Sequence, residues 1–332
     1  MSRIERIWYK GAAGAIPLLP ISWLFRLLVT VRRWLYQRGW LTVHRFTAPL
    51  IVVGNITVGG TGKTPFVIWL INCLRRAGYK PGMVSRGYGG GATEWPQQVT
   101  SDSDPALVGD EAVLLANRCQ CPMAVAPDRS AAVTALLDNN DCDVVIADDG
   151  LQHYAMGRDI EVVIIDGQRR FGNGQMLPAG PLREPVTRLN SVDLCIVNGE
   201  TVAADEYRMT LTQSYLYNLQ APSTRQAVSY FKGQAVHAVA GIGNPERFFD
   251  LLRNADVEVV AHPFSDHHAY SADDLAFSDD LPIVMTEKDA VKCMRFARPN
   301  HWAVAIEMAP TPESQVEEHL LSLLNKIDTA NN

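Results

Sequence analysis

The chain has 332 residues, which is long enough for two domains with separate hydrophobic cores. Its composition is that of a globular protein, and its six cysteines lie mostly in apolar runs with no second Cys or His pair, which excludes a disulfide framework and a zinc site. The net charge of −6 hides an asymmetry, because residues 1–46 carry eight basic side chains against the single acidic residue Glu5.

The N-terminal segment, residues 1–46, combines these charges with four tryptophans around the apolar run 15–31. The run is shorter than the ~20 apolar residues of a spanning helix, and two prolines and Arg26 interrupt it. Arg32 follows where a signal peptide would need small residues, so we read the glycosylation acceptor at Asn55 as a coincidence. We expect an amphipathic helix lying on an anionic membrane surface, with a helix packed on the protein's own core as the alternative. The basic residues are Arg3, Arg6, Lys10, Arg26, Arg32, Arg33, Arg38 and Arg45.

Short apolar runs then alternate with helix-length segments, which predicts β-α-β units and a parallel sheet. The expected strands are residues 49–55, 80–87, 122–126, 142–149, 160–167 and 192–199, and helices are expected at 63–78, at 109–118 and from about 128. A second α/β series follows, with strands at 235–243, 257–262, 282–289 and 302–308 and a closing helix from 312 to about 326.

This organisation predicts three parts: the N-terminal segment 1–46, a P-loop domain at 47–215 and a second, smaller α/β domain at 216–332. A crevice between the two α/β domains is the default place for a substrate. Residues 172–185 show neither a strand nor a helix pattern, and we expect them to form a mobile loop near the site.

A phosphate-binding loop is predicted at "NITVGGTGKTP", residues 55–65, between the first strand and the first helix. Three glycines allow backbone N–H groups to surround phosphate oxygens at the start of a helix. Lys63 would reach the β- and γ-phosphates, and the Thr64 hydroxyl would bind Mg²⁺. The usual leading glycine is replaced by Thr57, but Gly54 can make the turn. The nucleotide-binding residues would be Thr57, Gly59, Gly60, Thr61, Gly62, Lys63 and Thr64.

Two acidic residues, Asp148 and Asp149, end the apolar strand "DVVIADD" in the manner of a Walker B motif, whose carboxylate holds the metal. The guanine-reading tetrapeptide "NKID" does occur at 325–328, but it follows a helical pattern near the C-terminus, which argues against a GTPase. Val58 stands where the partitioning and sorting ATPases carry a signature lysine.

A kinase also needs a base for its acceptor and cations around the transferring phosphoryl group. Asp110 and Glu111 open a helix about 100° apart around its axis, so one could face metal and the other the acceptor. Arg129 opens another helix and could grip phosphate. His267 lies in a polar loop after a strand, beside Asp266.

The motifs "VVGNITVGGTGKTP", "SRGYGG", "GDE", "DDGLQH", "RRFGNGQMLPAGPLREP", "AGIGNPERFF", "FSDHHAY" and "MTEKDAVKC" occur in this order between residues 52 and 293. With them the chain closely resembles the tetraacyldisaccharide 4′-kinases, the lipid A 4′-kinases of Gram-negative bacteria. The resemblance covers nearly the whole chain, and that family also lacks the leading glycine of the loop.

The resemblance implies transfer of the γ-phosphate of ATP, with Mg²⁺, to the 4′-hydroxyl of a tetraacyldisaccharide 1-phosphate, by a peripheral enzyme on the cytoplasmic face of the bacterial inner membrane. It implies that Asp110 is the base and that His267 pairs with it across the domain crevice. The adjacent His268 is the alternative partner. Glu111 would contact the metal with Thr64, Asp148 and Asp149, and Arg129 would bind phosphate beside Lys63. Gln152 and His153 complete the second acidic motif.

The expected partners are therefore a lipid disaccharide and an anionic membrane surface, with no nucleic acid, and the chain is expected to be a monomer. The rival function is a membrane-associated P-loop switch ATPase that binds a partner and phosphorylates nothing.

Overall fold

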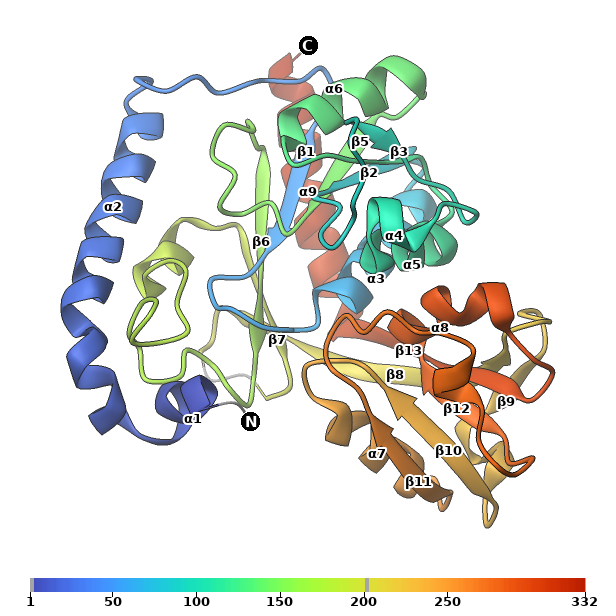
Figure 1. Cartoon of the computed structure of the whole chain (residues 1–332). Helices are drawn as coiled ribbons and strands as arrows, with labels where there is room; N and C mark the ends of the chain where they lie inside the picture. Colours follow the sequence, from blue (N-terminus) through green and yellow to red (C-terminus); the bar gives the residue numbers. More distant parts are fainter. Residues whose placement is uncertain (1–2, 201–202, 332) are drawn as a thin grey trace. The chain divides into compact units, whose positions relative to one another are not determined.

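The computed structural model describes residues 3–200 and 203–331 (Figure 1). Five residues lie outside it, together with the side chains of Arg3 and Lys10, two of the basic residues counted above. The chain divides into two compact units. Unit 1 comprises Met1–Arg86, Cys121–Thr210 and Ala309–Asn332, and unit 2 comprises Gly87–Gln120 and Leu211–Met308.

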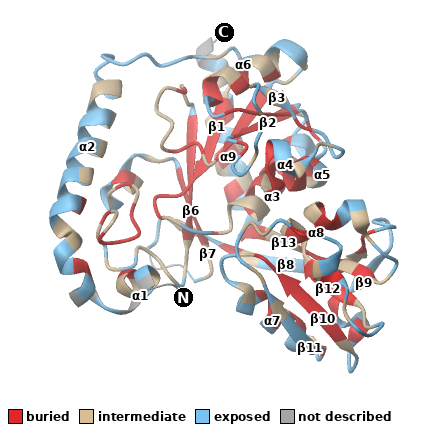
Figure 2. Cartoon of the chain, in the orientation of Figure 1, coloured by how far each residue is buried: buried red, intermediate tan, exposed pale blue. Residues whose placement is uncertain are grey.

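Unit 1 is built on a parallel sheet with the strand order β7-β6-β1-β5-β2-β4, to which the first residues of β8 add beside β7. β1 and β5 are buried along their whole length, as Figure 2 shows in red, because helices cover both faces of such a sheet. The expected parallel α/β sheet is therefore confirmed. The strands are β1 Leu50–Gly54, β2 Pro81–Ser85, β4 Met123–Val125, β5 Val144–Asp148, β6 Ile160–Asp166, β7 Leu194–Asn198 and β8 Glu206–Asn218.

The helices of unit 1 include α3, which follows the phosphate-loop sequence and buries eight apolar or sulfur-containing side chains. The tetrapeptide at 325–328 lies inside the last helix, α9, and so cannot be a strand-end loop. The helices are α1 Arg3–Lys10, η1 Ala12–Leu18, α2 Leu19–Gln37, α3 Lys63–Arg76, α6 Arg129–Asn139, η2 Val186–Ser191 and α9 Glu313–Asn331.

Helix α2 is exposed along most of its length, as its pale blue colour in Figure 2 shows. By length and composition, the span Gly14–Gln37 is apolar enough to cross a membrane, and only 11% of its most apolar window is buried in the protein. This exposure argues against a helix covered by the protein's own core. The exposed apolar side chains of α2 are Ile21, Trp23, Leu24, Leu27, Leu28, Val31 and Trp34.

Residues 172–185, expected to be a mobile loop, are instead tied down by backbone hydrogen bonds to themselves and to neighbouring segments. Met176, Ala179 and Leu182 are buried within this loop. Composition misled here because a segment without a helix or strand pattern can still be fixed when tertiary partners satisfy its backbone groups.

Unit 2 has the strand order β11-β10-β12-β13-β8-β9, in which β10, β11, β12 and β13 are mutually parallel and β9 is antiparallel to β8. Two buried clusters, one around Phe249 and one around Tyr270, form its core. Its remaining elements are β3 Gln97–Gln98, α4 Pro105–Val108, α5 Asp110–Cys119, β9 Arg225–Ala227, η3 Val228–Phe231, β10 Ala235–Ala240, α7 Pro245–Arg253, β11 Glu258–Pro263, η4 Asp273–Leu275, β12 Ile283–Thr286, α8 Glu287–Cys293, η5 Met294–Phe296 and β13 His301–Thr311.

The division into units differs from chain order at residues 87–120, which the sequence reading had assigned to the P-loop domain. In the structure they belong to unit 2, where Arg118 of α5 makes two hydrogen bonds, of 2.7 and 2.8 Å, to the carboxylate of Glu287 in α8. Strand and helix patterns do not predict this assignment, because they do not show which unit a segment packs against.

Candidate functional site

The phosphate-loop sequence occupies the turn between β1 and α3 in unit 1. Gly62 caps α3 with a φ of 91°, and a Cβ there would come within 2.4 Å of the Asn198 amide, so only glycine fits. Gly59 has a φ of 101°. The loop therefore brings backbone N–H groups to the amino end of a helix, which is the arrangement that binds phosphate.

Lys63 extends from the first position of α3 toward acceptors at the ends of β1 and β5. Its Nζ lies 3.3 Å from Asp149 Oδ1 and 3.4 Å from Asn55 Oδ1. The Asn55 amide in turn bonds the carbonyl of Gly59 at 3.3 Å. One cation is thus held between the lead-in of the loop and the acidic pair, where a phosphate oxygen could replace either acceptor.

The acidic pair ends β5, as the sequence predicted. Asp148 is buried, and Asp149 adopts a left-handed conformation with a φ of 50°, which turns its carbonyl toward Arg129 Nη2 at 3.0 Å. Burial alone would raise the pKa of Asp149, but the charges of Lys63 and Arg183 outweigh burial and hold that pKa below its usual value. Asp149 is therefore ionised at neutral pH.

Arg129 begins α6 and is buried, and burial lowers the pKa of its guanidinium. Its Nε has no hydrogen-bond partner within the described part of the chain. A buried guanidinium with an unused donor beside a phosphate loop is suited to an anion. His153 lies 3.4 Å from Asp128 at the start of the same helix, and burial, with Arg129 nearby, lowers the pKa of this imidazole.

Arg183 also belongs to this site, although no motif in the sequence predicts a role for it. Its Nη1 lies 3.2 Å from Asp149 Oδ2 and 3.4 Å from Gln152 Oε1. Gln152 also bonds the carbonyl of Asn55 at 3.0 Å. The only available signal was the motif "PLREP", which shows an arginine but not the acid that it meets.

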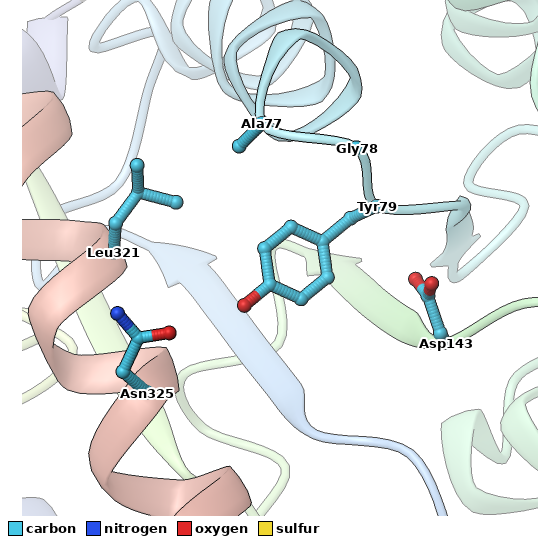
Figure 3. Close-up of a pocket in the computed structure, with 6 residues that line it drawn as sticks. All are labelled: Ala77, Gly78, Tyr79, Asp143, Leu321 and Asn325. Atoms are coloured by element: carbon cyan, nitrogen blue, oxygen red, sulfur yellow. The ribbon is translucent and has the colours of Figure 1, made fainter.

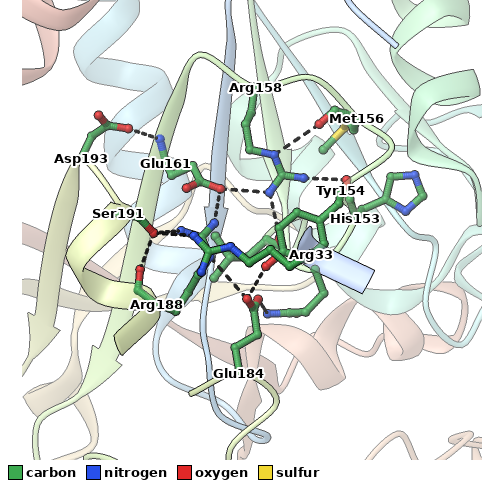
Figure 4. A network of polar contacts seen from close by, with 12 residues as sticks. Arg33, His153, Tyr154, Met156, Arg158, Glu161, Glu184, Arg188, Ser191 and Asp193 are labelled. Carbon is green, nitrogen blue, oxygen red and sulfur yellow. Dashed lines mark hydrogen bonds and ion pairs between the residues drawn. The ribbon is translucent and has the colours of Figure 1, made fainter. Parts of the chain in front are cut away.

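Figure 4 shows a buried ionic cluster around Glu161, Glu184 and Arg188, and Gln152 contacts it through Glu184. Glu184 is buried and accepts hydrogen bonds from Gln152 and from the hydroxyl of Tyr154, while Arg188 pairs with both Glu184 and Glu161. Burial and the charge of Glu184 raise the pKa of Tyr154 to about 12, so its phenol remains a donor. The cluster fixes the backbone on which Gln152 and Arg183 are carried.

Asp110 and His267 both lie in unit 2, and Asp110 Oδ2 is 3.1 Å from His267 Nδ1. The expectation that they belong to two different domains is therefore corrected, because residues 87–120 pack with unit 2. Asp110 Oδ1 accepts from the N–H of Glu111 at 2.8 Å, which fixes the carboxylate at the start of α5.

His267 has a φ of 59°, stands beside the ring of Tyr88 and has Lys288 Nζ 3.3 Å from its Nε2. His268 instead points to Asp274, whose carboxylate lies 3.4 Å from its Nε2. Of the two adjacent histidines, His267 is the one against Asp110.

A second basic residue stands behind Asp110. Lys292 Nζ lies 3.1 Å from Asp289 Oδ1 and 3.8 Å from Asp110 Oδ2, above the ring of Tyr270. Asp289 is fully buried. The pattern "MTEKDAVKC" contains both residues, but nothing in the sequence indicated that they meet the "GDE" motif.

The oxygen atoms near the loop in unit 1 suit Mg²⁺, which takes one or two carboxylates with hydroxyl and phosphate oxygens rather than a complete protein cage. Asp148, Asp149 and Thr64 supply such oxygens, and the buried Thr61 hydroxyl has no hydrogen-bond partner among the residues described. Within residues 3–200 and 203–331, no group of three or more His, Cys, Asp or Glu side chains could hold a metal without other ligands. Glu111 belongs to unit 2.

A hollow of about 360 Å³ in unit 1 is lined by Ala77, Gly78, Tyr79, Asp143, Leu321 and Asn325 (Figure 3). It borders the residues just before β2 and β5, at the amino ends of these parallel strands. The phosphate loop follows the carboxyl end of β1, so this hollow is not part of the site.

Comparison with known proteins gives one consistent result. The family model described as tetraacyldisaccharide-1-P 4′-kinase matches residues 14–325. A tetraacyldisaccharide 4′-kinase of Nitrosococcus oceani is 52% identical over 93% of this chain and 90% of the relative, and one of Methylobacillus flagellatus is 52% identical over 91% and 90%. A crystal structure of LpxK from Aquifex aeolicus in complex with ATP superposes with a TM-score of 0.82 at 25% identity, covering 93% of this chain and 99% of that one.

Proposed function

This chain belongs to the tetraacyldisaccharide-1-P 4′-kinase family, and we propose that it transfers the γ-phosphate of ATP to the 4′-hydroxyl of a tetraacyldisaccharide 1-phosphate. It is a phosphotransferase that acts on a lipid sugar. The observation that carries the proposal is the phosphate loop of unit 1, with Lys63 held between Asn55 and Asp149.

In this proposal the residues of unit 1 bind and orient the nucleotide. The backbone of residues 57–62 surrounds the phosphates, and Lys63 binds the γ-phosphate during its transfer. Arg129 and Arg183 supply further positive charge. Thr64, Asp148 and Asp149 would hold Mg²⁺, which supplies charge neutralisation at the phosphates. Glu111, the other acid of the "GDE" motif, remains a proposed metal contact.

The residues of unit 2 act on the acceptor. The Asp110 carboxylate accepts the proton of the 4′-hydroxyl as the new oxygen–phosphorus bond forms and the bond to the β-phosphate breaks, leaving ADP. His267 bonds Asp110 Oδ2 through Nδ1, so it orients the carboxylate and can share the proton. The exposed apolar face of α2 supports attachment to the cytoplasmic surface of the inner membrane, where an acylated substrate lies.

The test measures phosphate transfer to lipid by the full-length protein and by Asp110→Asn, with ³²P-labelled ATP and thin-layer separation of the products. We expect kcat to fall by about 10²- to 10⁴-fold while ATP binding is retained. Asp274→Asn is the matched control, because it alters the neighbouring aspartate–histidine pair.

Two results would contradict the proposal in different ways. Near-normal turnover by Asp110→Asn would contradict the assignment of Asp110 as the base, but the proposed kinase activity would stand. Release of labelled inorganic phosphate with no labelled lipid, from the unaltered protein, would instead favour the switch ATPase.

A further inference from the structure

Ser22 is the one buried residue described in helix α2, on a helix whose other side chains are largely exposed. Its hydroxyl donates to the carbonyl of Met176 at 2.7 Å and accepts from the N–H of Ala179 at 2.9 Å. Both bonds reach the loop at 172–185. A membrane-facing helix needs no such contact to bind lipid, so the contact calls for a different explanation.

Trp8 of α1 makes the same connection at a second point. Its indole Nε1 donates to the carbonyl of Pro178 at 3.0 Å, and its own carbonyl accepts from the N–H of Asn173 at 2.9 Å. The ring is buried. Four hydrogen bonds from two separate helices thus hold one side of the loop.

The other side of the loop 172–185 is bonded to the residues that precede the phosphate-binding glycines. Val58 N–H donates to the carbonyl of Pro181 at 2.9 Å, and Arg183 N–H donates to the carbonyl of Ile56 at 2.7 Å. Between them Thr57 and Leu182 form an antiparallel bridge. These bonds fix three successive residues, 56–58, immediately before the phosphate-binding glycines.

The loop itself is stiff enough to connect these two sets of bonds. Asn173 bonds the carbonyl of Ala179 through its amide at 2.8 Å, and the N–H of Gly180 bonds the carbonyl of Met176 at 3.0 Å. Gly180 has no room for a side chain, because a Cβ would come within 2.2 Å of Asn173. Displacing the Ser22 end therefore displaces the end that carries Arg183.

We propose that Ser22 and Trp8 are positioning residues for ATP binding, which act through the loop 172–185 on residues 56–58 and on Arg183. The inference rests on the proposed function, since it takes the phosphate loop as the ATP site. Removing the Ser22 hydroxyl leaves the buried Ala179 N–H without its partner and the Met176 carbonyl with the bond from Gly180 alone, and the loop must shift to satisfy the Ala179 N–H. The N-terminal segment is then a support for the nucleotide site as well as a membrane anchor.

The test compares full-length Ser22→Ala with Thr30→Ala. Thr30 is on the same helix, but its exposed hydroxyl bonds only the carbonyl of Arg26, within that helix. Equilibrium binding of ATP is measured without lipid, together with sedimentation on vesicles containing anionic phospholipid. We expect Ser22→Ala to bind ATP about fivefold more weakly or worse, which corresponds to ~1 kcal/mol, and Thr30→Ala to bind ATP normally.

Two further readouts separate positioning from general damage. Vesicle binding should be the same for both variants, and KM for ATP should rise in Ser22→Ala while kcat at saturating ATP is kept. Amide hydrogen exchange should accelerate at Val58 and Arg183 in Ser22→Ala alone. Trp8→Phe, which keeps an aromatic ring and loses the indole N–H that bonds Pro178, should show a smaller change of the same kind and serves if Ser22→Ala fails to fold.

The inference is overturned if Ser22→Ala and Trp8→Phe both match Thr30→Ala in ATP affinity and in exchange at Val58. It is also overturned if affinity falls only in parallel with vesicle binding. Because ATP binding is measured without phosphate transfer, these outcomes leave the proposed function standing. Failure of the proposed function would appear as a lack of ATP binding, or of lipid phosphorylation, by the unaltered protein.

Discussion

Lys292 is the residue whose surroundings most closely constrain the proposed base. It lies between two buried carboxylates, Asp289 and Asp110, and is itself mostly buried. The Asp289 carboxylate also accepts from Gly241 N–H at 3.0 Å and from the Thr286 hydroxyl at 2.6 Å, so it is rigidly placed. Without a cation here, two buried negative charges would face each other, which is strongly unfavourable.

Lys292→Met should therefore lower kcat for lipid phosphorylation by about tenfold or more, because Asp110 loses the cation that balances Asp289. KM for ATP should change little, since the nucleotide residues lie in unit 1. Steady-state kinetics at varied ATP separates the two parameters. Lys232→Met is the control, because Lys232 is an exposed lysine of unit 2 paired only with Asp256.

A double variant distinguishes charge balance from packing. Adding Asp289→Asn to Lys292→Met removes the second charge and keeps an oxygen acceptor for Gly241 and Thr286. We expect the double variant to regain part of the lost kcat. A further loss of kcat, equal to or greater than the sum of two separate effects, would show that Lys292 serves packing alone.

At the residue scale, sequence reasoning predicted the groups whose proposed role follows from local spacing. Lys63 and Asp149 were predicted because a strand, a glycine-rich turn and a helix are consecutive in the chain, and the structure places their side chains 3.3 Å apart. Arg183 and Lys292 were not found. Each contacts a carboxylate that is distant in sequence, and local periodicity does not predict such a contact.

At the scale of elements, the cluster in Figure 4 connects β6, η2 and the segment after β5. Arg188 is fully buried there and is paired with Glu161 and Glu184. Burial alone would lower the pKa of this guanidinium, but the hydrogen bond and the charge of Glu161 outweigh burial and raise that pKa. The guanidinium of Arg188 therefore stays charged. Its charge compensates the carboxylates of Glu161 and Glu184, which are buried from solvent.

Arg188→Met should lower the free energy of unfolding of unit 1 by about 3–5 kcal/mol, because it leaves the buried Glu184 without a cation and Glu161 with Arg158 alone. Urea denaturation followed by tryptophan fluorescence and circular dichroism measures the change. Arg253→Met, which removes an exposed arginine paired on α7, should leave the transition almost unmoved. Equal effects of the two substitutions would contradict the view that the cluster supports the site.

The elements that were predicted well are those buried on both faces. β1 and β5 were expected at residues 49–55 and 142–149 because an unbroken apolar run of that length is typical of a central parallel strand. β8 was missed. Its 13 residues are rich in polar side chains and mostly exposed or half-buried over the first nine positions, so the run shows no continuous apolar signal.

For the whole molecule, the order of the chain was a poor guide to which residues share a body. Unit 1 takes its last helix from the C-terminus, and unit 2 takes residues 87–120 from between β2 and β4. The two residues of the proposed dyad consequently fall in one unit. Sequence periodicity gives the type of each element, whereas its partner depends on long-range packing.

The two faces of α2 should therefore separate two functions of the whole protein. Trp23 and Leu27 are 62% and 58% exposed, whereas Ser22 of the same helix is buried and bonded to the loop 172–185. We expect Trp23→Ser with Leu27→Ser to abolish binding to anionic vesicles and turnover of vesicle-borne substrate, because the apolar area available to the membrane falls. ATP affinity and turnover of detergent-dispersed substrate should stay near normal, the reverse of Ser22→Ala. Loss of ATP affinity in the double variant would mean that the faces are not independent.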